Sequence, residues 1–120
     1  MNAAATPNVA RSASSNTVEI LERSGGSLEI KGALTFATAR KARQQGLHLL
    51  SVSAARTLEV DCSGITASDS AGLTVLLDWL AVAKRENRSL QLRNLPQSIR
   101  AVAQISDVAE LLEAGVRVDT

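Results

Sequence analysis

A carboxylate and a hydroxyl, Asp69 and Ser70, stand directly before a long apolar segment and are followed by the small residues Ala71 and Gly72 and then Leu73. Asp and Ser are favoured at the start of a helix, and small residues allow a loop to pack closely against a strand. The first N–H groups of such a helix and the positive end of its dipole lie at Ser70, where added negative charge is stabilised. The motif therefore predicts either a plain helix start or a site for phosphorylation or for contact with a partner protein.

The rest of the sequence does not support catalysis at Ser70. A nucleophilic serine needs a general base, but nothing places His48, the only histidine, near Ser70. The turn is neither a G-x-S-x-G nucleophile elbow nor a glycine-rich phosphate loop with a Lys-Ser/Thr end. Cys62, the only cysteine, falls in a predicted buried strand without a second metal-binding residue at a suitable spacing. The sequence thus predicts a protein that is not an enzyme and holds no metal and no cofactor.

The composition, with 45% hydrophobic and 21% charged residues in a chain of 120, predicts one globular domain. A net charge of +1 gives no reason to expect nucleic acid as a partner, and two aromatic residues, Phe36 and Trp79, are too few for base stacking. Because no apolar stretch approaches a membrane span and residues 1–16 lack the apolar region of a secretory signal, we expect a cytoplasmic location without direct membrane insertion. Residues 1–16 are predicted to be a disordered tail, and residues 17–118 the domain.

The first half of the domain has the pattern of a hairpin followed by a helix. Alternating apolar and polar residues predict strands at 17–22 and 28–32, joined by a glycine-containing turn. Thr35 is the expected N-cap of a helix over residues 36–50, which Gly46 is expected to end or bend. The residues of this helix expected to face the core are Phe36, Ala39, Leu47 and Leu50, and those of a basic, solvated face are Arg40, Lys41 and Arg43.

The second half alternates strands and helices. Its expected elements are a strand at 56–62, a polar loop at 63–68, a helix at 70–87, a strand at 89–93, a helix at 96–105 and a short helix that ends at Gly115. Pro96 suits a first helical position, and Asp107 and Glu110 have the spacing of a capping box. The order β-β-α-β-α-β-α-α predicts an α/β fold with an N-terminal hairpin, a mixed sheet of four or five strands, parallel crossovers and about four helices.

The helix at 70–87 has more apolar surface than one sheet face requires. One stripe contains Leu73, Leu76, Leu77 and Leu80, and a second contains Ala71, Val75 and Val82, with Trp79 leaning toward it. Either neighbouring helices of the same domain bury the second stripe, or a partner protein covers it. Because this stripe begins next to Ser70, the residues predicted to bind a partner are Asp69, Ser70, Ala71, Gly72, Leu73, Val75 and Trp79.

The run from Leu58 to Leu112 resembles a STAS domain, the fold of anti-sigma factor antagonists and related regulators. The resemblance rests on a strand that ends in Asp61-Cys62-Ser63-Gly64, followed by Asp69-Ser70-Ala71-Gly72-Leu73 at the start of a helix. The upstream GALTFATARKARQQG and the downstream RNLPQSIRAVAQISDVAELL are most similar to one branch, the MlaB-type subunit of the Mla phospholipid-transport ABC complex. The resemblance covers about residues 17–114 and implies the STAS fold.

This resemblance implies a non-catalytic cytoplasmic subunit, peripheral at the inner membrane, that binds and supports the transporter ATPase and through it the permease. Such a complex maintains outer-membrane lipid asymmetry in Gram-negative bacteria, and its STAS subunit docks by the helix start at Ser70. The alternative implied by the same family is an anti-sigma factor antagonist, in which a partner serine kinase phosphorylates the position of Ser70. A phosphate adds about −1.5 to −2 charges and would disrupt a closely packed interface. A serine serves in both roles, so its presence does not choose between them.

Overall fold

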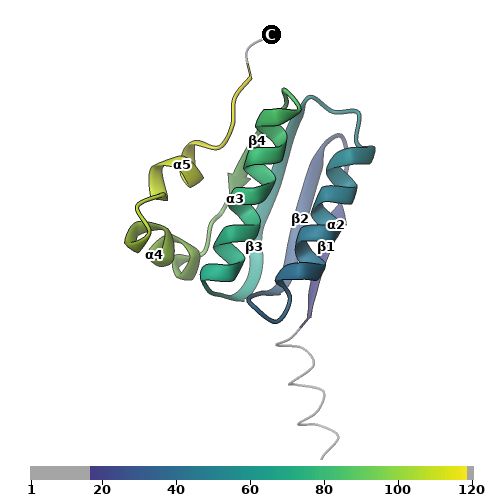
Figure 1. Cartoon of the computed structure of the whole chain (residues 1–120). Helices are drawn as coiled ribbons and strands as arrows, with labels where there is room; N and C mark the ends of the chain where they lie inside the picture. Colours follow the sequence, from purple (N-terminus) through teal and green to yellow (C-terminus); the bar gives the residue numbers. More distant parts are fainter. Residues whose placement is uncertain (1–16, 119–120) are drawn as a thin grey trace, which may run out of the picture.

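The computed structural model describes residues 17–118. These residues form one four-stranded sheet and four helices (Figure 1). In chain order the elements are β1 (Val18–Glu22), β2 (Ser27–Leu34), α2 (Ala39–Val52), β3 (Thr57–Ser68), α3 (Ser70–Arg85), β4 (Ser89–Arg93), α4 (Gln97–Ile105) and α5 (Ala109–Ala114). The predicted α/β fold and its order of strands and helices are confirmed. The expected tail at residues 1–16 lies outside the described residues.

The four strands lie in the order β1-β2-β3-β4. β1 and β2 form the predicted antiparallel hairpin, whereas β2 with β3 and β3 with β4 are parallel pairs. The helices α2 and α3 supply the two crossovers that parallel pairs require. Beyond β4, Val116 forms an antiparallel bridge with Leu90, in which each N–H donates to the other's carbonyl at 2.8 Å. The mixed sheet is therefore the one predicted, with a short bridge at the edge of β4.

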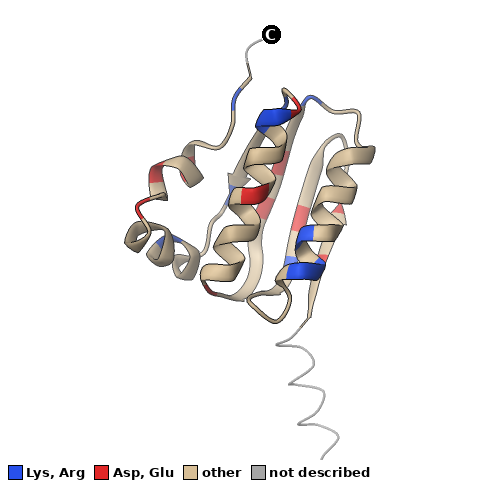
Figure 2. Cartoon of the chain, in the orientation of Figure 1, with Lys and Arg blue, Asp and Glu red and all other residues tan. Residues whose placement is uncertain are grey.

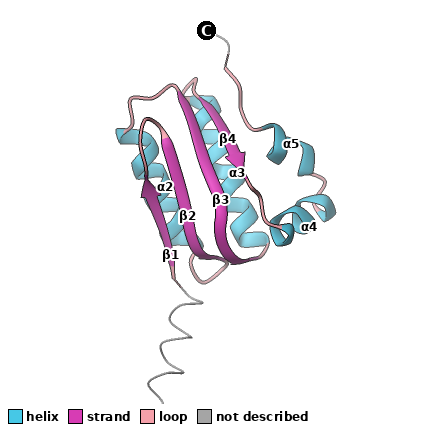
Figure 3. Ribbon diagram, turned by 180° about the vertical axis from the view of Figure 1, so that it is seen from behind, coloured by secondary structure: helices cyan, strands magenta, loops and turns pink. Residues whose placement is uncertain are grey.

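The helices α2 and α3 cover one face of the sheet, and the other face carries no helix among the described residues (Figures 1 and 3). Alternation along β3 separates the two faces, because Leu58, Val60 and Cys62 are fully buried. On the opposite face, the solvent-accessible side chains of Glu59 in β3 and Arg93 in β4 form an ion pair at 2.7 Å. The core therefore lies between the sheet and the two long helices, and the uncovered face is charged.

The strand β3 extends to Ser68, so the predicted polar loop at 63–68 is wrong. Its second half continues the parallel pairing with β2, from Gly64 opposite Lys31 to Ser68 opposite Leu34. Two register shifts absorb the irregular spacing of this pairing. Residues 63–68 are mostly polar or small, so they lack the alternation of apolar and polar residues that predicts a strand. Ile65 is nevertheless 7% exposed and packs in the core.

The start of α2 also differs from the prediction. The helix begins at Ala39, with Thr38 rather than Thr35 at the N-cap position. The buried Thr38 hydroxyl donates to the Ala33 carbonyl at 2.7 Å and accepts from the Thr35 N–H at 3.0 Å. These bonds close a turn before the helix, and Phe36 in this turn is 85% exposed. The expectation that Phe36 faces the core is therefore wrong, while Leu50 is buried as predicted.

The remaining differences concern helix ends. Pro96 is the N-cap of α4 and not its first residue, and α3 ends at Arg85, before the positive φ of Asn87. The predicted capping box of α5 is wrong, because Val108 is the N-cap and makes no side-chain cap bond. Gly115 ends α5 as predicted, at a φ of 67° that favours glycine.

Candidate functional site

The carboxylate of Asp69 holds together the start of α3. Its Oδ1 accepts hydrogen bonds from the backbone N–H groups of Ala71 at 2.9 Å and Gly72 at 3.1 Å. Its Oδ2 accepts from the backbone N–H of Phe36 at 3.0 Å. Asp69 is therefore the N-cap of α3 and also ties the loop between β2 and α2 to that helix.

Gly72 lets α3 approach the end of β2. A Cβ atom built at Gly72 would lie 2.1 Å from the carbonyl oxygen of Leu34, closer than any side chain permits. The next residue, Leu73, is 4% exposed and packs in the core. The small and apolar members of the motif therefore position the helix against the sheet.

The side chain of Ser70 is exposed at the first position of α3. Its carbonyl oxygen accepts from the Thr74 hydroxyl at 3.0 Å, but within residues 17–118 its own hydroxyl makes no hydrogen bond. Ala71 beside it is half-buried, and Thr74 one turn later is exposed. Of the five motif residues, Ser70 is thus the one whose side chain is fully offered to a partner.

Phe36 is a candidate site residue that the sequence pattern missed. Its ring is 85% exposed, and its backbone is held beside the Ser70 helix start by the bond to Asp69. A large exposed aromatic side chain next to a small polar one is typical of the centre of a protein interface. The sequence feature that could have revealed it is Thr38, a second candidate for the N-cap of α2 besides Thr35. The hydrogen bonds of the Thr38 side chain place the helix start after Phe36.

A groove of about 280 Å³ separates the first turns of α2 and α3. Its lining residues are Ala39, Arg40, Arg43, Ala71, Thr74, Val75 and Asp78. Arg43 and Asp78 form an ion pair across the two helices. Figure 2 shows the basic part of α2 close to its N-terminal end, on the side of the molecule where α3 begins. We call the exposed residues Phe36, Arg40, Ser70 and Thr74 the Ser70 surface.

In the second apolar stripe of α3, Val75 and Trp79 belong to the core, whereas Ala71 and Val82 are half-buried. Val75 is 4% exposed and Trp79 is 1% exposed, so of the two alternatives left open by the sequence, burial within the domain is the one that holds for these residues. A Cβ atom at Gly46 would lie 2.2 Å from the indole ring of Trp79, which shows that α2 packs directly on this side chain. α2 continues through Gly46 to Val52, so Gly46 does not end the helix, and α2 covers Trp79 in the second stripe.

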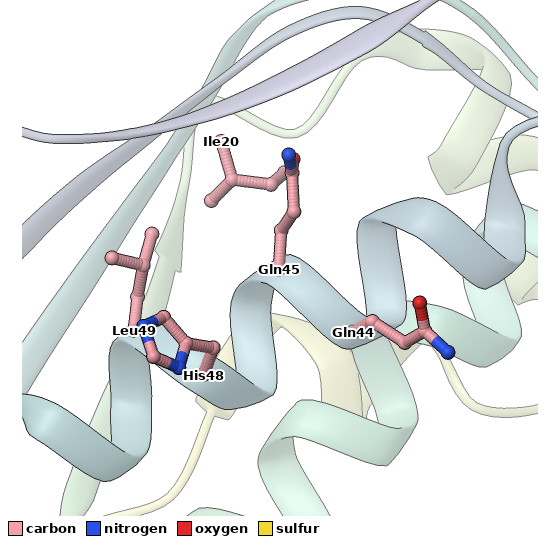
Figure 4. Close-up of a pocket in the computed structure, with 5 residues that line it drawn as sticks. All are labelled: Ile20, Gln44, Gln45, His48 and Leu49. Atoms are coloured by element: carbon pink, nitrogen blue, oxygen red, sulfur yellow. The ribbon is translucent and has the colours of Figure 1, made fainter.

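His48 is remote from Ser70. It lines a separate hollow of about 320 Å³ between β1 and α2, with Ile20, Gln44, Gln45 and Leu49 (Figure 4). Because Gly46 packs against Trp79, His48 is level with the part of α3 beyond Trp79. At 1.5 Å per residue this is roughly 13 Å or more from Ser70 along the helix. His48 thus cannot serve as a base for the Ser70 hydroxyl.

Cys62 also lies apart from any reactive site. Its thiol is fully buried, and this burial raises its pKa to about 12, so the group stays protonated. In the part of the chain that the structure describes, no three His, Cys, Asp or Glu side chains gather to hold a metal ion. None of the described helices is long and apolar enough to cross a membrane.

The model of the Mlab STAS domain family matches residues 20–113. The chain belongs to the MlaB-type STAS domain family. No significant match is found among curated protein sequences.

Two solved structures resemble this STAS domain. One is the anti-sigma factor antagonist SpoIIAA in its unphosphorylated form, with a TM-score of 0.62, 17% identity, and coverage of 87% of this chain and 89% of that one. The other is the murine Solute Carrier 26 family member A9 anion transporter in the inward-facing state, with a TM-score of 0.55 and 19% identity over 69% of this chain. The STAS domain spans only 14% of that transporter. At these identities the likeness shows the shared fold.

Proposed function

We propose that this STAS domain is a non-catalytic subunit that binds and supports the ATPase of an Mla-type ABC phospholipid transporter. In this role it lies at the cytoplasmic face of the inner membrane, without inserting into it, and helps to maintain outer-membrane lipid asymmetry. It needs no cofactor. The observation that carries the proposal is the exposed pair Phe36 and Ser70 on the frame that Asp69 holds, in a chain that matches the Mlab family model.

The geometry suits a standing interface. Three backbone N–H groups on one carboxylate fix the Phe36 loop and the start of α3 before any partner arrives. A surface that is already ordered loses little conformational freedom on binding, so more of the contact energy appears as affinity. Of the residues predicted to bind the partner, Ser70 makes direct contact. Ala71 lines the groove beside it, and Asp69, Gly72 and Leu73 hold the helix start in place. Val75 and Trp79 act from the core.

The second candidate function is an anti-sigma factor antagonist controlled by phosphorylation of Ser70. The observation that favours it is the exposed hydroxyl at the first position of α3, which has no hydrogen bond to residues 17–118. The N-terminal end of a helix stabilises a phosphate, and the added charge would prevent contact with the former partner.

Purification of the untagged protein from its native host, followed by mass spectrometry, separates the two functions. Under the proposed function an ABC ATPase and its permease co-purify with the STAS domain. Recovery of a small serine kinase without a transporter would instead establish the second function.

A further inference from the structure

We propose that the partner segment that docks beside Ser70 is acidic and places a carboxylate side chain in the groove between α2 and α3, against Arg40. This inference rests on the proposed function, because it names the chemistry of the surface that the ATPase presents. It commits to an acidic protein segment as the occupant of the groove.

The charges around the groove are predominantly positive. Arg40, Lys41 and Arg43 lie within the first two turns of α2. Arg43 is neutralised by Asp78, whereas Arg40 and Lys41 have no ion pair within residues 17–118. Asp69, at the start of α3, has both carboxylate oxygens engaged by backbone N–H groups. Arg40 is therefore the groove-lining charge that a partner is left to neutralise.

The groove, of about 280 Å³, has apolar walls beside a charged group, an arrangement that suits the side chain of a partner protein. Ala39, Ala71 and Val75 supply apolar walls, and Val75 at 4% exposure closes the bottom. A Glu or Asp side chain fits such walls with its stem and reaches Arg40 with its carboxylate. The exposed ring of Phe36 offers apolar contact to neighbouring residues of the same segment.

An acidic partner also accounts for the position of Ser70. The groove begins at Ala71, directly after Ser70. A phosphate on Ser70 would face the partner's carboxylates at close range, and like charges at an interface cost affinity. The same surface thus binds an acidic segment when Ser70 is unmodified and repels that segment after phosphorylation.

Charge reversal on α2 tests this inference with a matched control. Arg40→Glu and Lys41→Glu make the same change of charge in the first turn of α2, where a carboxylate is stabilised by the helix dipole, so both variants should fold. Of these two residues, Arg40 lines the groove and Lys41 does not. The probe is the purified ATPase subunit that co-purifies with the unmodified protein, titrated by calorimetry at low and high salt.

We expect Arg40→Glu to weaken binding by about tenfold or more, and Lys41→Glu by about threefold or less. The affinity of the unmodified protein should fall as salt rises, because charge pairs at an interface rim are screened. Equal affinities of the two variants, or an affinity that salt does not change, would overturn the acidic-segment inference alone. Absence of any binding by the unmodified protein would overturn the proposed function, and this inference with it.

Discussion

At the scale of single residues, the members of the Asp69-Ser70-Ala71-Gly72-Leu73 motif have different roles. Asp69 accepts three backbone N–H groups, and Gly72 lets α3 approach the Leu34 carbonyl. Ser70 alone has an exposed side chain without a hydrogen bond to the described residues. A short motif of this kind is thus mostly a frame, and Ser70 is the one of its five residues with an exposed side chain.

Ser70→Glu should weaken binding of the ATPase by about tenfold or more while leaving the fold intact. The first position of a helix accepts negative charge, so we expect the free energy of unfolding to change by less than about 0.5 kcal/mol. Calorimetric titration and urea unfolding measure the two effects. Ser70→Ala is the control and should bind as the unmodified protein does; unchanged affinity of Ser70→Glu would reduce Ser70 to a structural helix start.

Residue types predicted the site only in part. Asp69 and Ser70 were identified because their types and their place before an apolar helix are specific. Phe36 was missed because a pattern of apolar spacing places it on the helix, whereas the Thr35–Thr38 turn delays the helix to Ala39. Hydrogen bonds between a threonine side chain and the nearby backbone compete with helix formation in this way. Composition does not reveal whether the turn or the helix forms.

At the scale of elements, the packing of α2 on α3 rests on Gly46 and Trp79. The helical wheel of α3 showed a second apolar stripe, but a wheel does not say which element covers it. Gly46 was expected to weaken α2, yet it provides the space for the indole of Trp79. Its effect is on the contact between two helices, which is invisible in the pattern of either one.

Gly46→Ala should destabilise the protein although alanine is the better helix former. The added methyl group meets the Trp79 ring at 2.2 Å, and such overpacking costs about 1–3 kcal/mol, more than the gain of about 1 kcal/mol from helix propensity. In a Trp79→Leu background the clash is removed, so there Gly46→Ala should be neutral or stabilising. Urea unfolding of the four proteins measures this; an equal cost in both backgrounds would show that Gly46 does not act through Trp79.

At the scale of the whole molecule, Arg88 joins the end of α2 to the strands. Its guanidinium donates to the carbonyls of Ser53 and Ala55 at 2.8 Å each, and also to the carbonyl of Leu50. These carbonyls lie at the C-terminal end of α2 and in the loop before β3, where the chain supplies no backbone donors of its own. One side chain directly before β4 therefore fixes the connection between the first crossover and the sheet.

Arg88→Ala should lower the free energy of unfolding by about 1–3 kcal/mol, because it leaves partly buried carbonyls without donors. Arg85→Ala, at the exposed end of α3, is the matched control and should change the stability by less than about 0.5 kcal/mol. Thermal or urea unfolding distinguishes the two variants. Similar stabilities would mean that water replaces Arg88 at no cost.

The overall fold was predicted more fully than its details. A hairpin followed by alternating strands and helices leaves few arrangements open, since parallel crossovers keep one handedness and short connections. The second half of β3 was not predicted, because its pairing with β2 passes through two register shifts that break the alternation. Long-range pairing of this type is decided by the neighbouring strand and not by the segment's own composition.

The central claim is that the Ser70 surface, with Phe36 exposed beside it, binds the transporter ATPase. The most direct measurement is calorimetric titration of the ATPase with Phe36→Ala and with Ile105→Ala. Both residues are large, apolar and similarly exposed, at 85% and 86%, but Ile105 lies at the end of α4, outside the Ser70 surface. Phe36→Ala should lose about tenfold or more in affinity with an unchanged unfolding transition, and Ile105→Ala should bind normally. Full affinity of Phe36→Ala, or an equal loss in both variants, would contradict the claim.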